Sequence, residues 1–375
     1  MKIILVGTAY PLRGGLAAFN ERLISQFIRE GHDASIRTFS LQYPEFLFPG
    51  KTQYSADDAP DKLPIEVCIN SINPFNWLWQ GLRLRKAKPD ILIFKFWLPF
   101  MAPCFGTIIR IAKLNRHTKV ICIADNIVPH ETRFFDKPFI KYFVKSCDGF
   151  ISMSESVKND LFRFRPKAKH QLVFHPVYDN FGNGVEKAIA RNFFNLKTDD
   201  KVILFFGFIR RYKGLDLLLK AMADLRIRQA GIRLIIAGEY YEDKTFYTQL
   251  IDDLGIADLL IMKDDFIPNE EVKMYFSAAD LVVQPYRSAT QSGITQLAYH
   301  FEKPMVVTNV GGLPELVPHH IAGYVCEPDE NHIADAIMDF YADGNMLKFN
   351  QGIMQEKKKY RWENLTRAVV ELSSE

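Results

Sequence analysis

The stretch LVVQPYRSATQSGITQLAYHFEKPMVVTNVGGLPE, residues 281–315, repeats one pattern, a buried strand followed by small residues and a helix. The apolar run Leu281–Gln284 predicts the first strand, and Gly293–Phe301 predicts the helix that follows it. A second strand over Pro304–Thr308 leads into the pair Gly311-Gly312. The first backbone N–H groups of a helix have no partner within the helix and carry partial positive charge. Two such turns on neighbouring strands therefore predict a binding site for a diphosphate.

The same alternation of short apolar runs and amphipathic segments continues along the whole chain. It predicts an α/β fold with two doubly wound, Rossmann-like domains, each built on a parallel sheet covered on both faces. The length of 375 residues agrees with two domains. Because residues 175–184 are rich in proline, glycine and asparagine, they are predicted to link the two. We expect an N-terminal domain over residues 1–178, a C-terminal domain over residues 179–345 and a charged helical segment over residues 346–375.

Composition excludes several classes of protein. The net charge of +3 is too small to favour nucleic-acid binding. The five cysteines are scattered without a Cys-x-x-Cys pair, and no metal-site spacing occurs. No run of about 18 uncharged apolar residues is present, so no membrane-spanning segment is expected. These features predict a cytoplasmic protein without a metal site.

Two polar motifs follow predicted strands of the first domain. Gly14 and Gly15 would let a ligand approach the backbone at the start of a helix, although a plain tight turn explains them equally well. Asp125, His130 and Glu131 follow the strand predicted for residues 120–124. Such side chains can bind sugar hydroxyls or transfer protons. The alternative for His130 and Glu131 is that they cap the next turn.

A third motif, residues 207–214, follows the first predicted strand of the second domain. It begins at Gly207 and contains Arg210 and Lys213. Basic side chains at a strand end can neutralise phosphate, and arginine can bind two oxygens at once. The alternative is a solvated turn.

Taken in order, these motifs resemble those of one family. They are the Gly-Gly turn, a Gly-x-x-Arg-x-x-Lys-Gly turn, Ala237-Gly238-Glu239, Phe276-Ser277-Ala278-Ala279-Asp280, the segment from Glu302 to Thr308, and Gly311-Gly312-Leu313-Pro314-Glu315. The chain is similar in this respect to the group-1 family of retaining glycosyltransferases (family four), whose GT-B fold has two Rossmann-like domains facing across a cleft. The similarity extends over nearly the whole chain and is most specific between Leu204 and Val317.

The resemblance implies a hexosyltransferase type of enzyme that needs neither metal nor cofactor. The donor would be a nucleotide-diphosphate sugar bound mainly by the C-terminal domain. The acceptor, a glycan or a lipid-linked molecule, would bind the N-terminal domain, and the final helix would cross back to that domain. The resemblance also points to bacterial surface polysaccharide biosynthesis.

The resemblance also assigns individual residues. Lys213 matches the family's diphosphate-binding lysine, whereas the usual arginine position is Phe208, so its role falls to Arg210. Asp125 occupies the place of a histidine that contacts the transferred sugar. The implied catalytic residues are Asp125, His130, Arg210 and Lys213. The implied donor-binding residues are Gly14, Gly15, Gly207, Gly238, Glu239, Gln291, Ser292, Gly293 and Gln296.

One departure from the family concerns two glutamates that contact the sugar and the ribose. Their positions fall on Thr290 and Ala298, neither of which is acidic. The base and sugar of the donor, the acceptor, the linkage and the oligomeric state therefore stay open. Two alternatives stay open. The same loss suggests a non-catalytic subunit that binds nucleotide sugar, whereas a nucleotide-sugar epimerase would need carboxylates that these two positions lack.

Two stretches, residues 77–86 and 134–145, mix aromatic side chains with lysine and arginine. Such stretches can lie on anionic lipid, which would place the protein peripherally on the cytoplasmic face of the inner membrane. The alternative is that the aromatic side chains are core and the basic ones solvated.

Overall fold

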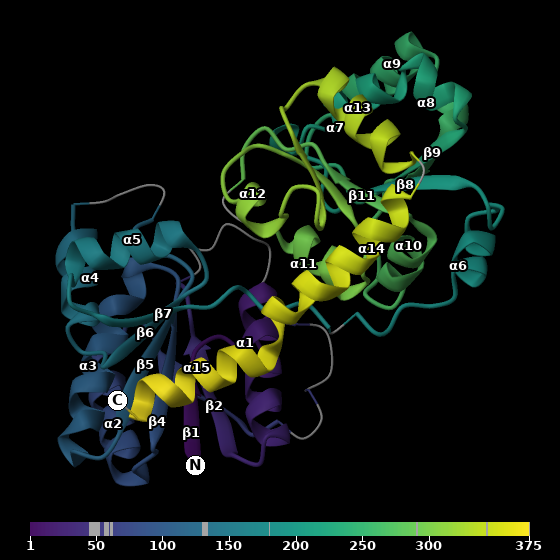
Figure 1. The fold of residues 1–375 in the computed structure, drawn as a ribbon. Helices are drawn as coiled ribbons and strands as arrows, with labels where there is room; N and C mark the ends of the chain where they lie inside the picture. Colours follow the sequence, from purple (N-terminus) through teal and green to yellow (C-terminus); the bar gives the residue numbers. More distant parts are fainter. Residues whose placement is uncertain are drawn as a thin grey trace. The chain divides into compact units, whose positions relative to one another are not determined.

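The computed structural model describes residues 1–44, 53–55, 60, 63–129, 134–179, 181–289, 292–342 and 344–374. By its internal packing the chain divides into two compact units. The N-terminal unit comprises Met1–His175 together with Trp362–Glu375, and the C-terminal unit comprises Pro176–Arg361. The last helix of the chain is thus part of the first unit (Figure 1).

The N-terminal unit contains a seven-stranded sheet in the order β3-β2-β1-β4-β5-β6-β7, and all its paired strands are parallel. The central strands are buried along their length because both faces of the sheet are covered, as a doubly wound fold requires. The strands are β1 (Lys2–Val6), β2 (Asp33–Leu41), β3 (Ile65–Asn70), β4 (Ile91–Phe96), β5 (Lys119–Ala124), β6 (Gly149–Ser152) and β7 (Lys169–Leu172).

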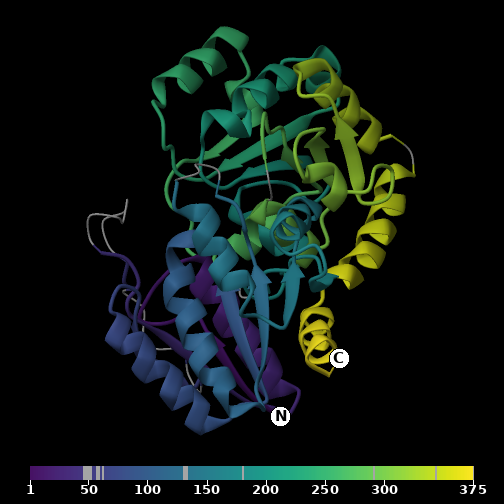
Figure 2. The same ribbon diagram turned by 90° about the vertical axis from the view of Figure 1, so that its left-hand side faces the viewer.

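Helices cover both faces of this sheet, as Figures 1 and 2 show. One face packs against α2, α3, α4 and α5, and the other packs against α1 and α15. In α1, Phe19, Leu23 and Phe27 recur at helical spacing and are buried against the sheet. The helices are α1 (Gly15–Arg29), α2 (Pro74–Ala87), α3 (Ala102–Ala112), α4 (Asp136–Val144), α5 (Glu155–Phe164) and α15 (Trp362–Ser374), with 3-10 turns η2 (Pro99–Met101) and η3 (Lys113–Asn115).

The C-terminal unit contains a six-stranded parallel sheet in the order β10-β9-β8-β11-β12-β13. The order reverses between β8 and β11, and ligands of open α/β sheets bind beyond the carboxyl ends of the strands at such a point. The strands are β8 (Lys201–Phe206), β9 (Ile232–Ala237), β10 (Leu260–Lys263), β11 (Leu281–Gln284), β12 (Met305–Thr308) and β13 (Gly323–Cys326).

The helices of the C-terminal unit include α7, α8, α9 and α13, which share one apolar core with the sheet. On the other face, Phe276 of α10 contacts Phe206 of β8, and Phe301 stacks on Phe276. The helices are α6 (Lys187–Phe193), α7 (Leu215–Met222), α8 (Leu225–Gln229), α9 (Thr245–Leu254), α10 (Val272–Ala278), α11 (Gly293–His300), α12 (Leu313–Leu316), α13 (Glu330–Phe340) and α14 (Asn345–Glu356), with 3-10 turns η4 (Arg211–Lys213), η5 (Ala257–Leu259) and η6 (Lys357–Tyr360).

The predicted fold class, two doubly wound α/β domains with parallel sheets, is confirmed. Two details differ from the prediction. A single helix was expected over residues 214–228, but Asp224 accepts a hydrogen bond from the Arg226 backbone N–H and begins a second helix, α8. Strand β3 lies at the edge of its sheet, between the long loop predicted over residues 43–64 and the helix predicted over residues 74–88, where the sequence predicted no element. Within the described ranges, every helix is too short or too polar to cross a membrane.

Candidate phosphate and sugar sites

Glycine-rich turns follow β8 and β9 at the carboxyl edge of the C-terminal sheet. Gly207 has φ 98° and Gly238 has φ 141°, both in a region that favours glycine. A Cβ atom at Gly238 would lie 2.3 Å from the Gly207 carbonyl oxygen. The two turns can therefore approach this closely only because Gly238 has no side chain.

The turn after β12 approaches the loop after β11 in the same way. Gly311 has φ 54°, and its Cβ would lie 1.5 Å from the carbonyl oxygen of Ala289. The Gly312 backbone N–H donates to the same oxygen at 3.3 Å. The two turns predicted to cradle a diphosphate are thus brought together by a contact between their backbones.

Replacing Gly311 with alanine is expected to displace this loop and weaken nucleotide binding about tenfold or more, because the new methyl group overlaps a backbone oxygen. The matched control is Gly255→Ala, since Gly255 has a similar φ of 61° but no atom near its Cβ position. For each variant, the rise in melting temperature that UDP causes is measured as the sign of nucleotide binding. Equal behaviour of the two variants would mean that strain in φ alone, and not the contact between the turns, matters here.

Lys213 is the most unusual side chain at this edge. It is buried, with 9% of its surface exposed, and its pKa is lowered to about 8, first by burial and then by the charge of Arg210. Its Nζ atom lies 3.1 Å from the position of a Gly207 Cβ, and Ile294 in the first turn of α11 lies 3.2 Å from the same point. No carboxylate pairs with Lys213 among the described residues. The end of β8, the lysine and the start of α11 therefore meet at one place, where a buried ammonium group has no anion.

Arg210 is exposed beside this position, and its guanidinium lies 4.8 Å from the ring centroid of Tyr241. Tyr241 also packs edge-on against Phe208 at 4.6 Å. Both aromatic side chains are largely exposed. The sequence did not single out Tyr241, because an aromatic residue in a loop gives no periodic signal.

Ser292 faces the core. Its Oγ donates to Oε1 of Gln284 at 2.6 Å, and Thr295 donates to the same oxygen at 3.1 Å. Its side chain therefore fixes the start of α11 to β11, and only its backbone is left for a ligand. The prediction that Ser292 binds the donor therefore rests on its backbone N–H, since a glutamine at the end of a buried strand takes the bond of its hydroxyl. Gly293, at the first position of α11, is exposed and free of side-chain capping.

The remaining predicted donor residues of this unit lie in different surroundings. Gln296 is buried, and its Oε1 has no hydrogen-bond partner among the described residues. Glu239 is exposed next to Gly238. Ala298 is fully buried in α11. Thr290 and Gln291 lie outside the described residues.

In the N-terminal unit, Gly14 and Gly15 lie at the start of α1. Both are exposed, and a Cβ at either would meet no atom within 4 Å. The N-cap residue Gly14 has no side chain to satisfy the first N–H groups of the helix. The predicted open backbone at this turn is therefore present.

Asp125 follows β5 and forms an ion pair with a residue that the sequence analysis did not select. Lys95 of β4, with 1% of its surface exposed, places its Nζ 2.6 Å from Oδ1 of Asp125. The Lys95 ammonium also lies 3.6 Å from the ring centroid of Phe19. Burial lowers the pKa of Lys95, and the Asp125 carboxylate opposes that shift. The sequence feature that could have identified Lys95 is a single charged residue inside an otherwise apolar strand. His130 and Glu131 lie outside the described residues.

Comparisons with known proteins were made for sequence and structure. Residues 186–359 match the family model of glycosyl transferases group 1. An uncharacterised glycosyltransferase of Methanocaldococcus jannaschii is 23% identical over 397 residues, which cover 99% of this chain and 97% of that protein. A D-inositol 3-phosphate glycosyltransferase of Mycolicibacterium smegmatis is 30% identical over 208 residues, which cover 53% of this chain and 46% of that protein.

Among solved structures, HepE of Anabaena in complex with UDP aligns over 100% of both chains with a TM-score of 0.71 and 16% identity. A glycosyltransferase of Rickettsia africae aligns over 99% of this chain and 97% of its own with the same TM-score and identity. At these identities the likeness shows a shared fold.

Proposed function

We propose that the chain is a retaining glycosyltransferase of family four, and the match of residues 186–359 to the family model of glycosyl transferases group 1 supports this. It would move a sugar from a nucleotide-diphosphate sugar to a glycan or a lipid-linked acceptor. The observation that carries this proposal is the buried Lys213 ammonium beside Gly207, which has no carboxylate partner in the described part of the chain.

The energetics of Lys213 favour an anionic ligand. Burying an ammonium group costs several kcal/mol unless an opposite charge compensates it. A diphosphate at the strand ends would supply that charge. It would also accept hydrogen bonds from the free N–H groups at the start of α11. Arg210 would add a second cation, so that no metal ion is required.

In the proposed reaction the bond between the sugar's anomeric carbon and the diphosphate oxygen breaks. A new bond forms from the acceptor oxygen to the same face of that carbon, and the acceptor proton moves to the departing diphosphate. Negative charge builds up on the β-phosphate as the old bond breaks. Lys213, Arg210 and the backbone N–H groups at the start of α11 would stabilise that charge, which is the largest contribution a site of this kind makes.

We propose that the N-terminal unit binds the acceptor and orients the sugar through Asp125. Its carboxylate is positioned by the buried Lys95, and it can still accept hydrogen bonds because it is partly exposed. This arrangement supports hydrogen bonding to a sugar hydroxyl.

A lipid-linked acceptor and peripheral contact with a membrane draw support from α2. Phe75, Leu78, Trp79 and Leu82 are exposed and recur at the spacing of one helix face. Arg85 and Lys86 lie in the last turn of the same helix. In residues 134–145, Phe134 is 94% exposed, whereas Phe143 is fully buried. An apolar face next to basic side chains suits anionic lipid, and we propose on this ground a cytoplasmic enzyme of surface polysaccharide assembly.

The experiment that tests the activity is a donor screen. Thermal unfolding is measured with UDP-, GDP- and ADP-sugars, and the stabilising donor is then incubated with an acceptor panel. We expect one nucleotide to raise the melting temperature and NMR of the product to show the anomeric configuration of the donor. The matched variant is Lys213→Met, which should lose the stabilisation.

The screen also separates the alternatives. A product with inverted configuration would contradict the retaining mechanism. Conversion of donor alone to an epimer would favour an epimerase. Binding without transfer to any acceptor would favour a non-catalytic subunit, which the buried methyl group of Ala298 in place of a glutamate also suggests.

A further inference from the structure

Lys303, which has no ion pair within the described part of the chain, lines a cavity at the opposite edge of the C-terminal sheet. The cavity has a volume of about 380 Å³. Asp280 and Lys303, which line it, come just before β11 and β12, so it lies at the amino ends of these strands. Gly207 and Lys213 lie beyond a carboxyl end, and the cavity is therefore separate from the phosphate site.

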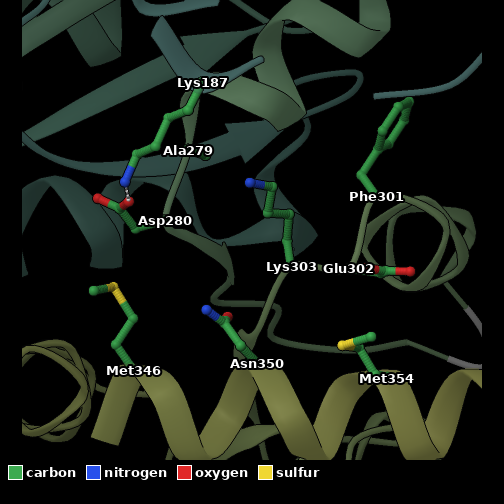
Figure 3. A pocket seen from close by; sticks show the side chains of 9 residues that line it. All are labelled: Lys187, Ala279, Asp280, Phe301, Glu302, Lys303, Met346, Asn350 and Met354. Carbon is green, nitrogen blue, oxygen red and sulfur yellow. Dashed lines mark hydrogen bonds and ion pairs between the residues drawn. The ribbon is translucent and has the colours of Figure 1, made fainter. Parts of the chain in front are cut away.

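The acidic group of this cavity is fully paired. Asp280 accepts two hydrogen bonds of 3.0 Å from Arg191 and one of 2.6 Å from Lys187. The Val202 backbone N–H and the Tyr341 hydroxyl also donate to it, at 2.9 and 3.1 Å. Asp280 therefore has no lone pair to spare for Lys303, although Figure 3 shows both lining the cavity.

The second carboxylate at the rim is paired as well. Lys357 binds Glu302 at 3.0 Å and the His300 carbonyl oxygen at 2.8 Å. Lys303 has neither an ion pair nor a side-chain hydrogen bond among the described residues. The pKa of Lys303 is lowered to about 8, chiefly by burial, which the Asp280 carboxylate opposes; the charges of Lys187 and Arg191 add to the lowering, and Glu302 opposes it. The cavity thus contains a partly buried cation that has no direct partner among the described residues.

The wall opposite Lys303 is mostly apolar. Met346, Asn350 and Met354 project from one face of α14 toward the lysine (Figure 3). Phe301 closes another side. Methionine side chains adapt to different apolar shapes, and the asparagine amide can donate hydrogen bonds. The wall therefore suits the apolar body of a ligand whose polar head reaches the lysine.

We propose that this cavity binds a small organic anion, a carboxylate or phosphate monoester with a short apolar body. The head would bind the Lys303 ammonium and the Asn350 amide, and the body would contact Met346, Met354 and Phe301. The volume agrees with sites for small ligands, which are mostly apolar with a few polar groups that fix orientation. Helix α11 begins beside the phosphate site and ends at His300, with Phe301 as its C-cap, so an occupant would contact the far end of the same helix.

Binding is tested by NMR of the whole protein labelled at its methionine methyl groups, in a Lys213→Ala background that removes the buried ammonium of the phosphate site. Hexanoate, hexyl phosphate, 1-hexanol and inorganic phosphate are titrated separately. We expect hexanoate or hexyl phosphate to shift the signals of Met346 and Met354, assigned by leucine substitution. The signals of Met101 and Met222, in other parts of the fold, should not move. The tighter of the two ligands identifies the head group.

Lys303→Gln should weaken binding about tenfold to a hundredfold, the range for a hydrogen bond to a charged group. Lys220→Gln, at an exposed lysine of the same unit, should leave it unchanged. Because a substitution at the partly buried Lys303 could disturb folding, Met354→Glu gives a second test. Met354 is 53% exposed, and the added carboxylate should repel the anion and abolish its binding.

Four results would overturn the proposal. They are equal binding of 1-hexanol, binding of inorganic phosphate alone, no methionine shift with either organic anion, and full affinity in folded Lys303→Gln. None of them bears on the glycosyltransferase proposal, because the phosphate site is already disabled in this background.

Discussion

Turnover of the Lys213→Ala variant is expected to fall about a hundredfold or more, the equivalent of roughly 3 kcal/mol in the barrier, while the fold survives. The reason is the position of the ammonium group at the end of β8, next to the start of α11. Charge that develops on the departing diphosphate would lose its nearest cation. The measurement is kcat with a saturating donor, so that a loss of ground-state binding does not mask the effect.

Replacing Lys213 should lower turnover but make the ligand-free protein more stable. Lys213→Met keeps the aliphatic stem but removes a buried charge that has no partner in the described chain, and should raise the free energy of unfolding by about 1–3 kcal/mol at pH 7. Urea unfolding measures this. If substitution of Lys213 makes the protein more stable and lowers its turnover, the lysine is retained for function and not for stability.

The pKa of Lys213 adds a dependence on pH. Its folded value of about 8 lies below the ordinary value of 10.5, so the unfolded state binds more protons between these limits. The free energy of unfolding should rise with pH across that window in the wild type and not in Lys213→Met. In contrast, kcat/KM should fall as pH rises above about 8, because the free enzyme loses the cation.

Lys220→Ala, on the exposed side of α7, is the control for all three measurements and should behave like the wild type. Near-normal turnover of Lys213→Ala would remove the lysine from the reaction. Unchanged stability of Lys213→Met would show that the ammonium is compensated in solution.

The second large effect concerns Asp125. Asp125→Ala should destabilise the N-terminal unit by about 3–5 kcal/mol, because it leaves the Lys95 ammonium buried without its partner. Thermal or urea unfolding checks this. A loss of transfer in Asp125→Ala alone would therefore not distinguish a missing sugar contact from a damaged unit.

The double variant Lys95→Met/Asp125→Asn removes both charges and keeps the volume of both side chains. It should recover most of the lost stability, since replacing a buried ion pair by uncharged groups is often nearly neutral. If its transfer rate is still low, Asp125 acts on the substrate; if the rate recovers, the ion pair is purely structural. A stable Asp125→Ala variant would contradict the buried-pair argument.

Much of the C-terminal unit follows from its sequence. Buried strands such as Leu281–Gln284 are continuous apolar runs, and the glycines at their ends are required by backbone contacts, as Gly238 and Gly311 show. These signals are local in the chain, so periodicity and composition reveal them. The sequence also predicted that Lys213 lies close to the start of α11, because both follow strands of the same parallel sheet.

The features that the sequence did not predict depend on contacts between segments that are distant in the chain. Lys95 looks like an interruption of an apolar strand until the fold places Asp125 beside it. The hydroxyl of Ser292 donates to Gln284, a hydrogen bond that the sequence alone did not reveal. Strand β3, with Glu66 and Cys68 on an edge, lacks the continuous apolar run of a central strand. In each case the partner that decides the role is far away in sequence or on a neighbouring strand.

Helix α15 completes the apolar face of the first unit. Trp362, Leu365 and Leu372 pack with Ile3, Leu5 and other residues near the beginning of the chain. During synthesis on the ribosome these first strands emerge long before their covering helix exists. The N-terminal half must therefore wait, with part of its interior open to water or to chaperones, until the second unit has been translated and residues 362–374 arrive. A fragment cut after residue 175 would keep that exposed surface permanently.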